Sequence, residues 1–181
     1  MKRIAQFETV SRSRFVTDYA EAFAITDSKE IDRIYDALKL PARATAGSAG
    51  YDFFAPQAFE LRPSETIRIP TGIRARMEEG WVLMLFPRSG LGFKYRLQLD
   101  NTAGVIDSDY INAKNEGHIF CKLTNDSKDG KTLRVEAGEG FAQGIFLPFG
   151  ITYDDETGMG HYWYLSISGF DGSLETTPFW D

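Results

Sequence analysis

Residues 81–92 read Trp-Val-Leu-Met-Leu-Phe-Pro-Arg-Ser-Gly-Leu-Gly, an apolar run that ends in a glycine-rich polar stretch. The continuous apolar run predicts a strand that is buried on both faces. Period-two alternation at residues 66–69 and 73–77 predicts two more strands before it. Turn residues separate the runs at regular spacing, which indicates an all-β barrel or sandwich. Further strand-like runs lie at 118–124, 132–135 and 144–149.

The clearest helical pattern lies near the N-terminus, at residues 27–39. Asp27 stands at the N-cap position, and Pro41 prevents the helix from continuing. Residues 17–25 give only a weak helical signal. The apolar face of the predicted helix is formed by Ile31, Ile34, Tyr35 and Leu38.

Length and composition bear on the number of domains. A chain of 181 residues that is 43% hydrophobic can bury one good core, so we expect a single domain over residues 1–181. We divide it into an N-terminal extension with the helix (1–41), a barrel core (42–149) and a C-terminal segment (150–181) that could act as a lid.

Charge and cysteine usage exclude several classes of function. The formal net charge of −6 argues against binding a nucleic-acid polymer, which needs clustered basic charge, but it leaves room for a single nucleotide. The sequence shows neither a signal peptide nor a membrane-spanning run, so we expect a cytoplasmic protein without membrane contact. Cys121 is the single cysteine, which excludes an intrachain disulfide, and we expect it to be a small core residue.

The polar stretch after the apolar run has the groups needed to hold phosphate oxygens. Gly90 and Gly92 let backbone N–H groups approach an anion, Ser89 adds a hydroxyl donor, and Arg88 adds a forked cation. The stretch lacks the lysine and hydroxyl spacing of a Walker loop. Taken alone, it could equally be a strand-ending turn with a surface arginine.

A second polar stretch follows at residues 101–110, Asn-Thr-Ala-Gly-Val-Ile-Asp-Ser-Asp-Tyr. Asp107 follows two apolar residues and therefore lies at a strand end, where a partly desolvated carboxylate can act as a base. Asn101 offers the donor and acceptor that suit the edge of a pyrimidine. Tyr110 offers a flat ring for packing against a sugar. Singly, Asp107 could be a turn former and Tyr110 a core aromatic.

In combination these stretches resemble the trimeric dUTP diphosphatases (dUTPases). Four motifs of that family have counterparts here in the right order and with similar spacing, across roughly residues 42–149. Details such as residues 115–119 and 143–149 resemble the bacillus and phage branch. The counterparts are Ala49-Gly-Tyr-Asp52, Pro87-Arg-Ser-Gly-Leu-Gly-Phe-Lys94, Asn101-Thr-Ala-Gly-Val-Ile-Asp-Ser-Asp-Tyr110 and Gly138-Glu-Gly-Phe-Ala-Gln143.

The resemblance implies a jelly-roll β-barrel and a role for each matching residue. Asp107 would deprotonate the water that attacks the α-phosphorus of dUTP, with release of pyrophosphate. Asn101 and backbone groups of the third motif would read uracil, and Tyr110 would exclude ribose. The residues implied in substrate binding are Arg88, Ser89, Gly90, Asn101, Gly104, Val105, Ile106, Tyr110, Gln143 and Phe170.

The resemblance also implies a homotrimer and a magnesium ion carried mainly by the triphosphate. We expect no metal site made by the protein itself. The two histidines, His118 and His161, stand far apart in the sequence, and we expect structural roles for both.

Two motifs depart from the family pattern. Gly140 stands where the family usually has an arginine that pairs with the first-motif aspartate, so the partner of Asp52 is open. The glycine-rich fifth motif is degenerate: Ser166 replaces its arginine, and Phe170 could be either its lid aromatic or a packing residue. Because loss of a transition-state arginine can cost orders of magnitude in rate, slow turnover is one expected consequence.

These departures leave two alternatives to a dUTP diphosphatase. One is a dUTPase-like protein that binds nucleotide or a protein partner with weak or no turnover, which the altered tail and Gly140 would favour. The other is a dCTP deaminase, which the same superfamily contains and for which Glu116 is a weak catalytic candidate.

Overall fold

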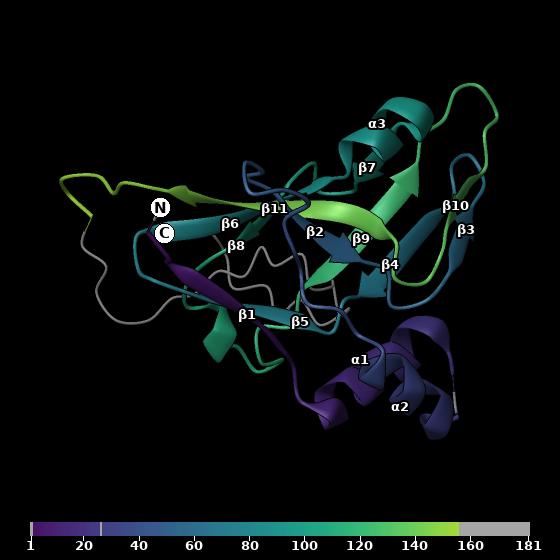
Figure 1. The fold of residues 1–181 in the computed structure, drawn as a ribbon, viewed down its shortest axis with the longest axis horizontal. Coiled ribbons are helices and arrows are strands. Elements are labelled where there is room, and N and C mark those ends of the chain that lie inside the picture. The colour runs from purple at the N-terminus through teal and green to yellow at the C-terminus, as the bar shows by residue number, and fades with distance from the viewer. Residues whose placement is uncertain (1, 26, 156–181) are drawn as a thin grey trace, which may run out of the picture.

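The computed structural model describes residues 2–25 and 27–155 and shows a fold built mainly of β-strands (Figure 1). This confirms the all-β prediction. The strands in chain order are β1 (Ala5–Thr9), β2 (Tyr51–Phe54), β3 (Phe59–Leu61), β4 (Thr66–Pro70), β5 (Ile73–Met77), β6 (Trp81–Pro87), β7 (Leu97–Leu99), β8 (Gly104–Ile106), β9 (Phe120–Asn125), β10 (Leu133–Val135) and β11 (Gly140–Pro148).

The strands form two main sheets and two short antiparallel pairs. One sheet has the order β2-β11-β6-β8 and the other β4-β9-β7, while β1 pairs with β5 and β10 with β3. The pairing of β1 with β5 runs from Ala5 opposite Met77 to Thr9 opposite Ile73. The start of the N-terminal extension is therefore part of the β structure.

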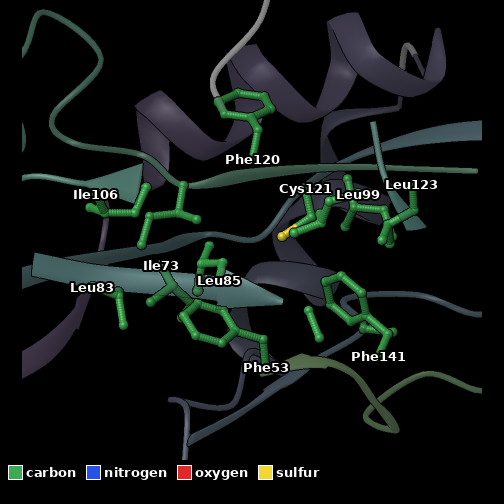
Figure 2. Packing of buried hydrophobic residues seen from close by; sticks show 14 of the residues in the cluster. Phe53, Ile73, Leu83, Leu85, Leu99, Ile106, Phe120, Cys121, Leu123 and Phe141 are labelled. Atoms are coloured by element: carbon green, nitrogen blue, oxygen red, sulfur yellow. The ribbon is translucent and has the colours of Figure 1, made fainter. Parts of the chain in front are cut away.

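The core lies between the strands, where buried side chains from different sheets meet (Figure 2). Strand β9 contributes Cys121 and Leu123, which are fully buried, so the expected core role of the cysteine is confirmed. Burial raises the pKa of the Cys121 thiol to about 12. Strand β6 differs from expectation, because only Leu83 and Leu85 are buried and their neighbours are half-buried.

Two helices lie between β1 and β2 in the chain and are placed together below β4 and β5 in Figure 1. Helix α2 (Ser28–Asp36) confirms the predicted helix, and the Asp27 carboxylate accepts a hydrogen bond from the Lys29 amide at 2.9 Å. Helix α1 (Arg12–Phe23) begins earlier than the weak signal indicated, because Ser11 caps it. The two helices bury a small core of their own, made of Val10, Phe15, Tyr19 and Ile31.

The polar stretch that follows the apolar run is helical and not the strand-ending turn that the sequence alone also allowed. After Arg88, which has extended backbone, residues Ser89–Tyr95 form the short helix α3. Arg96 ends it in a left-handed conformation with φ of 50°. Tyr110–Asn112 form a 3₁₀ turn, η1. Within the residues that the structure describes, no helix is long and apolar enough to cross a membrane.

Replacing a core residue of β9 should cost far more stability than replacing its exposed neighbour. Leu123→Ala is expected to lower the free energy of unfolding by about 2–5 kcal/mol, because it leaves a cavity in the barrel core. The matched variant Lys122→Ala removes only an exposed ion pair with Asp100 and should cost less than about 1 kcal/mol. Urea denaturation followed by fluorescence measures both, and equal losses would contradict this description of the core.

Candidate active site

Arg88 lies at the end of β6, where the strand passes into helix α3. Its Nη2 lies 3.8 Å from Oδ2 of Asp52 on β2, and its Nη1 donates a hydrogen bond of 3.5 Å to the carbonyl oxygen of Gly140. The Arg88 side chain is 44% exposed, so one side of the guanidinium faces solvent. Asp52 therefore has a partner, and that partner comes from the second motif.

Gly140 lies against this pair. A Cβ atom at this position would lie 3.5 Å from Nη1 of Arg88 and 3.5 Å from Cβ and Cγ of Asp52. A longer side chain would have to share that space with Arg88. Arg88 thus occupies the neighbourhood of Asp52 in the absence of an arginine at 140.

Gln143 joins the same cluster from β11. Its register partners are Asp52 on β2 and Phe86 on β6, so it lies between the first and second motifs. Its Nε2 donates to the Pro87 carbonyl oxygen at 3.2 Å. Gly50 leaves room for it, because a Cβ there would lie 3.3 Å from Oε1 of Gln143. Sequence reasoning singled out Gln143 but missed this packing role of Gly50.

Ser89 and Gly90 are exposed and form the first turn of helix α3. The first amides of a helix have no partner within it and can donate to an anion. A Cβ at Gly90 would meet nothing within 4 Å, so this surface is open. The structure therefore brings together Arg88, Ser89, Gly90 and Gln143, with Asp52 behind the guanidinium.

The third motif forms the turn between β7 and β8, followed by η1. Asn101 is exposed in the turn, and its carbonyl oxygen accepts a hydrogen bond from the Ala103 amide at 2.7 Å. Strand β8 is at the end of its sheet, and within residues 2–25 and 27–155 no other strand pairs with its outer edge. Val105 is 44% exposed, while Gly104 and Ile106 are buried.

Asp107 follows β8 and reaches solvent. Partial burial raises the pKa of its carboxyl group above its ordinary value, and the negative charge of Asp109 raises it further. Such a carboxylate binds a proton more readily than an ordinary aspartate and suits a general base.

Tyr110 is buried, with only 6% of its surface exposed. Its hydroxyl donates to the His118 carbonyl oxygen at 3.1 Å and accepts from Nδ2 of Asn115 at 2.7 Å. Its amide donates to the Asp107 carbonyl oxygen at 3.2 Å. The ring is therefore fixed beside the segment that carries Asp107.

Within one chain, Asp107 and Arg88 do not meet along β6. Strand β8 runs antiparallel to β6, with Ile106 opposite Leu83 and Gly104 opposite Leu85. Asp107 lies beyond Leu83, whereas Arg88 lies beyond the other end of this pairing. Because a strand rises about 3.3 Å per residue, the five residues from Leu83 to Arg88 span roughly 16 Å. Arg88 and the Asp107 carboxylate are thus at opposite ends of the pairing between β6 and β8.

The candidate lid residue Phe170 lies outside the described residues, as do Ser166 and His161. His118 is buried and bonded to Asp18, which confirms a structural environment. Among residues 2–25 and 27–155, no group of three or more His, Cys, Asp or Glu could hold a metal ion.

The mostly β fold and the order of the four motifs are those of a β-barrel protein with a candidate nucleotide site. Comparison with known proteins places the chain in a family. The dUTPase family model matches residues 36–157, more than half of the chain. The chain belongs to the dUTPase family. This confirms the resemblance drawn from the four motifs.

Relatives with this sequence similarity include two bacterial proteins named deoxyuridine 5'-triphosphate nucleotidohydrolase. The protein from Lactococcus lactis is 41% identical over 120 residues, covering 66% of this chain and 79% of its own. That from Mannheimia succiniciproducens is 37% identical over 150 residues, covering 75% and 95%.

Solved structures agree on the fold. The crystal structure of dUTPase from Streptococcus mutans has 37% identity and a TM-score of 0.58, over 81% of this chain and 97% of that one. The dUTPase of Staphylococcus bacteriophage 80alpha has 21% identity and a TM-score of 0.59, over 95% and 99%. At that identity the phage protein supports the jelly-roll fold alone.

The environment of Asp107 predicts an elevated titration midpoint. Its carboxyl ¹³C resonance should titrate above the ordinary pKa of 3.8, and Asp109→Asn should move the midpoint down by removing a negative charge. Because the pKa is higher in the folded than in the unfolded state, ionised Asp107 disfavours folding above that pKa. Asp107→Asn should therefore raise the melting temperature at pH 7. A midpoint at or below 3.8 would contradict this.

Proposed function

We propose that the protein hydrolyses dUTP to dUMP and pyrophosphate. The observation that carries this proposal is the pairing of family membership with Asp107, a carboxylate of raised pKa that directly follows the open-edged strand β8. A base in that position can accept a proton from water beside a bound nucleotide.

In the proposed reaction Asp107 takes a proton from a water molecule. The water oxygen forms a bond to the α-phosphorus, the bond from that phosphorus to the bridging oxygen breaks, and pyrophosphate leaves with the electron pair. Positioning and charge neutralisation supply most of the rate in such reactions. The raised pKa of Asp107 fits the need for a base that is ionised at neutral pH and still accepts a proton.

The phosphate chain is assigned to the cluster at the end of β6. Arg88 would donate from the exposed side of its guanidinium, and Ser89 and Gly90 from the start of helix α3. Gln143 would add an amide, since it already lies against Pro87. Magnesium would enter as part of the nucleotide substrate.

The base and sugar are assigned to the third motif. Asn101 and the backbone groups of Gly104, Val105 and Ile106 would read uracil along the open edge of β8. Tyr110 would limit the space beside the sugar, because hydrogen bonds from its amide and from its hydroxyl fix the position of its ring. Phe170 remains the candidate lid.

We also propose that the active site forms between copies of the chain, in a homotrimer. The support is the separation of Arg88 from Asp107 along β6 within one chain. A second copy of the chain could place its own Asp107 beside Arg88. Three apolar side chains at the end of β11 and just beyond it, Leu147, Phe149 and Ile151, are also exposed among the described residues. A cytoplasmic location, where nucleotides are made and used, belongs to the same proposal.

One observation favours the alternative of binding with little turnover. Arg88 already has Asp52 as a partner, so part of its charge is engaged before any phosphate arrives. Calorimetry with dUTP that shows binding without pyrophosphate release would favour this alternative. The deaminase alternative loses support, because the Glu116 carboxylate accepts hydrogen bonds from Ser11 at 2.6 and 2.7 Å.

The test of the main proposal is pyrophosphate release from dUTP with magnesium present. Asp107→Asn should lower kcat by about 10²–10⁴-fold, because it removes the general base. The matched variant Asp129→Asn changes an exposed carboxylate in a turn and should keep wild-type turnover. A folded wild-type protein that releases no pyrophosphate would overturn the proposal.

Arg88→Lys should weaken substrate binding, since lysine keeps the charge but lacks the planar fork. A charge-assisted hydrogen bond contributes about 1.5–3 kcal/mol, so we expect KM for dUTP to rise about tenfold or more. Asp52→Asn frees the guanidinium and should not raise KM to that extent. Steady-state kinetics on both variants provides the measurement, and an unchanged KM in Arg88→Lys would remove Arg88 from the phosphate site.

A further inference from the structure

The segment that carries Tyr110 is closed by a tight loop. Glu116 and Gly117 both have positive φ, of 62° and 72°. A Cβ at Gly117 would lie 2.6 Å from Cα of Ile111, so the chain here folds back directly onto η1. The Gly117 amide donates to Oδ1 of Asn115 at 3.1 Å, and the same Asn115 donates to the Tyr110 hydroxyl. The position of Tyr110 therefore depends on the end of this loop.

His118 ends the loop and is fully buried. Its Nε2 accepts a hydrogen bond from the Gly72 amide at 2.8 Å, so in the neutral ring the proton is on Nδ1. Nδ1 lies 2.6 Å from Oδ2 of Asp18 on helix α1 and donates to it. Burial lowers the pKa of His118, which favours this neutral form.

Helix α1 makes a second contact with the loop. The amide and hydroxyl of Ser11, which caps the helix, both donate to the Glu116 carboxylate. The hydrogen bond from the Ser11 hydroxyl lowers the pKa of Glu116. Asp18 is in turn held by Arg14, whose Nη2 lies 3.1 Å from Oδ1. Two carboxylates and one imidazole thus connect the helix to the loop.

These polar contacts add to apolar packing, in which the His118 ring lies 4.5 Å from the Phe120 ring and 6.2 Å from the Phe15 ring. Helices α1 and α2 have their own apolar cluster, and the barrel core is a separate one that includes Tyr110. Asp18 is 9% exposed, so the carboxylate is committed to this contact rather than to solvent. A change at Asp18 therefore removes this polar contact without removing any member of either apolar cluster.

We propose that Asp18 is a positioning residue that fixes Tyr110 through His118, so that helix α1 contributes to rejection of the 2'-hydroxyl. This inference rests on the proposed dUTP hydrolysis and on Tyr110 lying beside the sugar. Asp18 orients the His118 ring, the His118 carbonyl oxygen holds the Tyr110 hydroxyl, and the ring limits the space for a ribose. The N-terminal helices are in this way part of substrate selection.

The experiment compares kcat/KM for dUTP and for UTP in the full-length protein. Asp18→Ala should lower the dUTP-to-UTP ratio by about tenfold or more, since misplacing a positioning group by about 1 Å can cost about 100-fold. Asp18→Asn keeps an oxygen that accepts from Nδ1 and should restore most of the ratio. Glu21→Gln changes an exposed carboxylate of the same helix, 3.8 Å from Arg68, and should leave the ratio unchanged.

Ser11→Ala provides a milder variant in case Asp18→Ala does not fold, and it should shift the ratio in the same direction by a smaller factor. A lowered melting temperature with an unchanged ratio in the folded variants would show a purely structural role and overturn the inference. Wild-type protein that releases no pyrophosphate from dUTP would overturn the proposed function and this inference together. An active wild type with an unchanged ratio in the variants would overturn this inference alone.

Discussion

The backbone pairing of β6 with β11 on one side and β8 on the other positions Arg88, Gln143 and Asp107 of the candidate site. Seven residue pairs join β6 to β11, from Trp81 opposite Pro148 to Pro87 opposite Ala142. This register puts Gln143 opposite Phe86, near the end of β6 that leads to Arg88, and Asp52 of β2 opposite Gln143. The pairing of β6 with β8 puts Asp107 near the other end of β6, beyond Leu83. A shift of one residue would turn the buried Leu83 and Leu85 to the opposite face, so the core fixes the register.

Local sequence patterns predicted most elements because each depends on neighbouring residues. The alternation at 66–69 and 73–77 corresponds to β4 and β5, and the Asp27 cap starts α2 as expected. Helix α1 was underestimated because its two buried aromatics, Phe15 and Tyr19, pack against a helix that lies later in the sequence. The short helix α3 was missed because its two glycines have low helix propensity.

The site residues were found by motif, but their interactions were not. Nothing near Asp52 in the sequence indicates Arg88 as its partner, because that contact depends on the pairing of β2, β11 and β6. The pairing of Asp18 with His118 spans 100 residues and has no local signal. The chemistry of single residues is thus readable from sequence, whereas the partners that tune it come from the fold.

The central claim is that Arg88 of one copy and Asp107 of another complete a site, and subunit complementation tests it most directly. Two inactive variants, Arg88→Ala and Asp107→Asn, would be denatured together, refolded as a mixture and assayed for pyrophosphate release from dUTP. The account predicts that activity returns in the mixture, because some sites then contain both wild-type residues. A mixture that forms mixed oligomers and stays as inactive as either variant alone would contradict it.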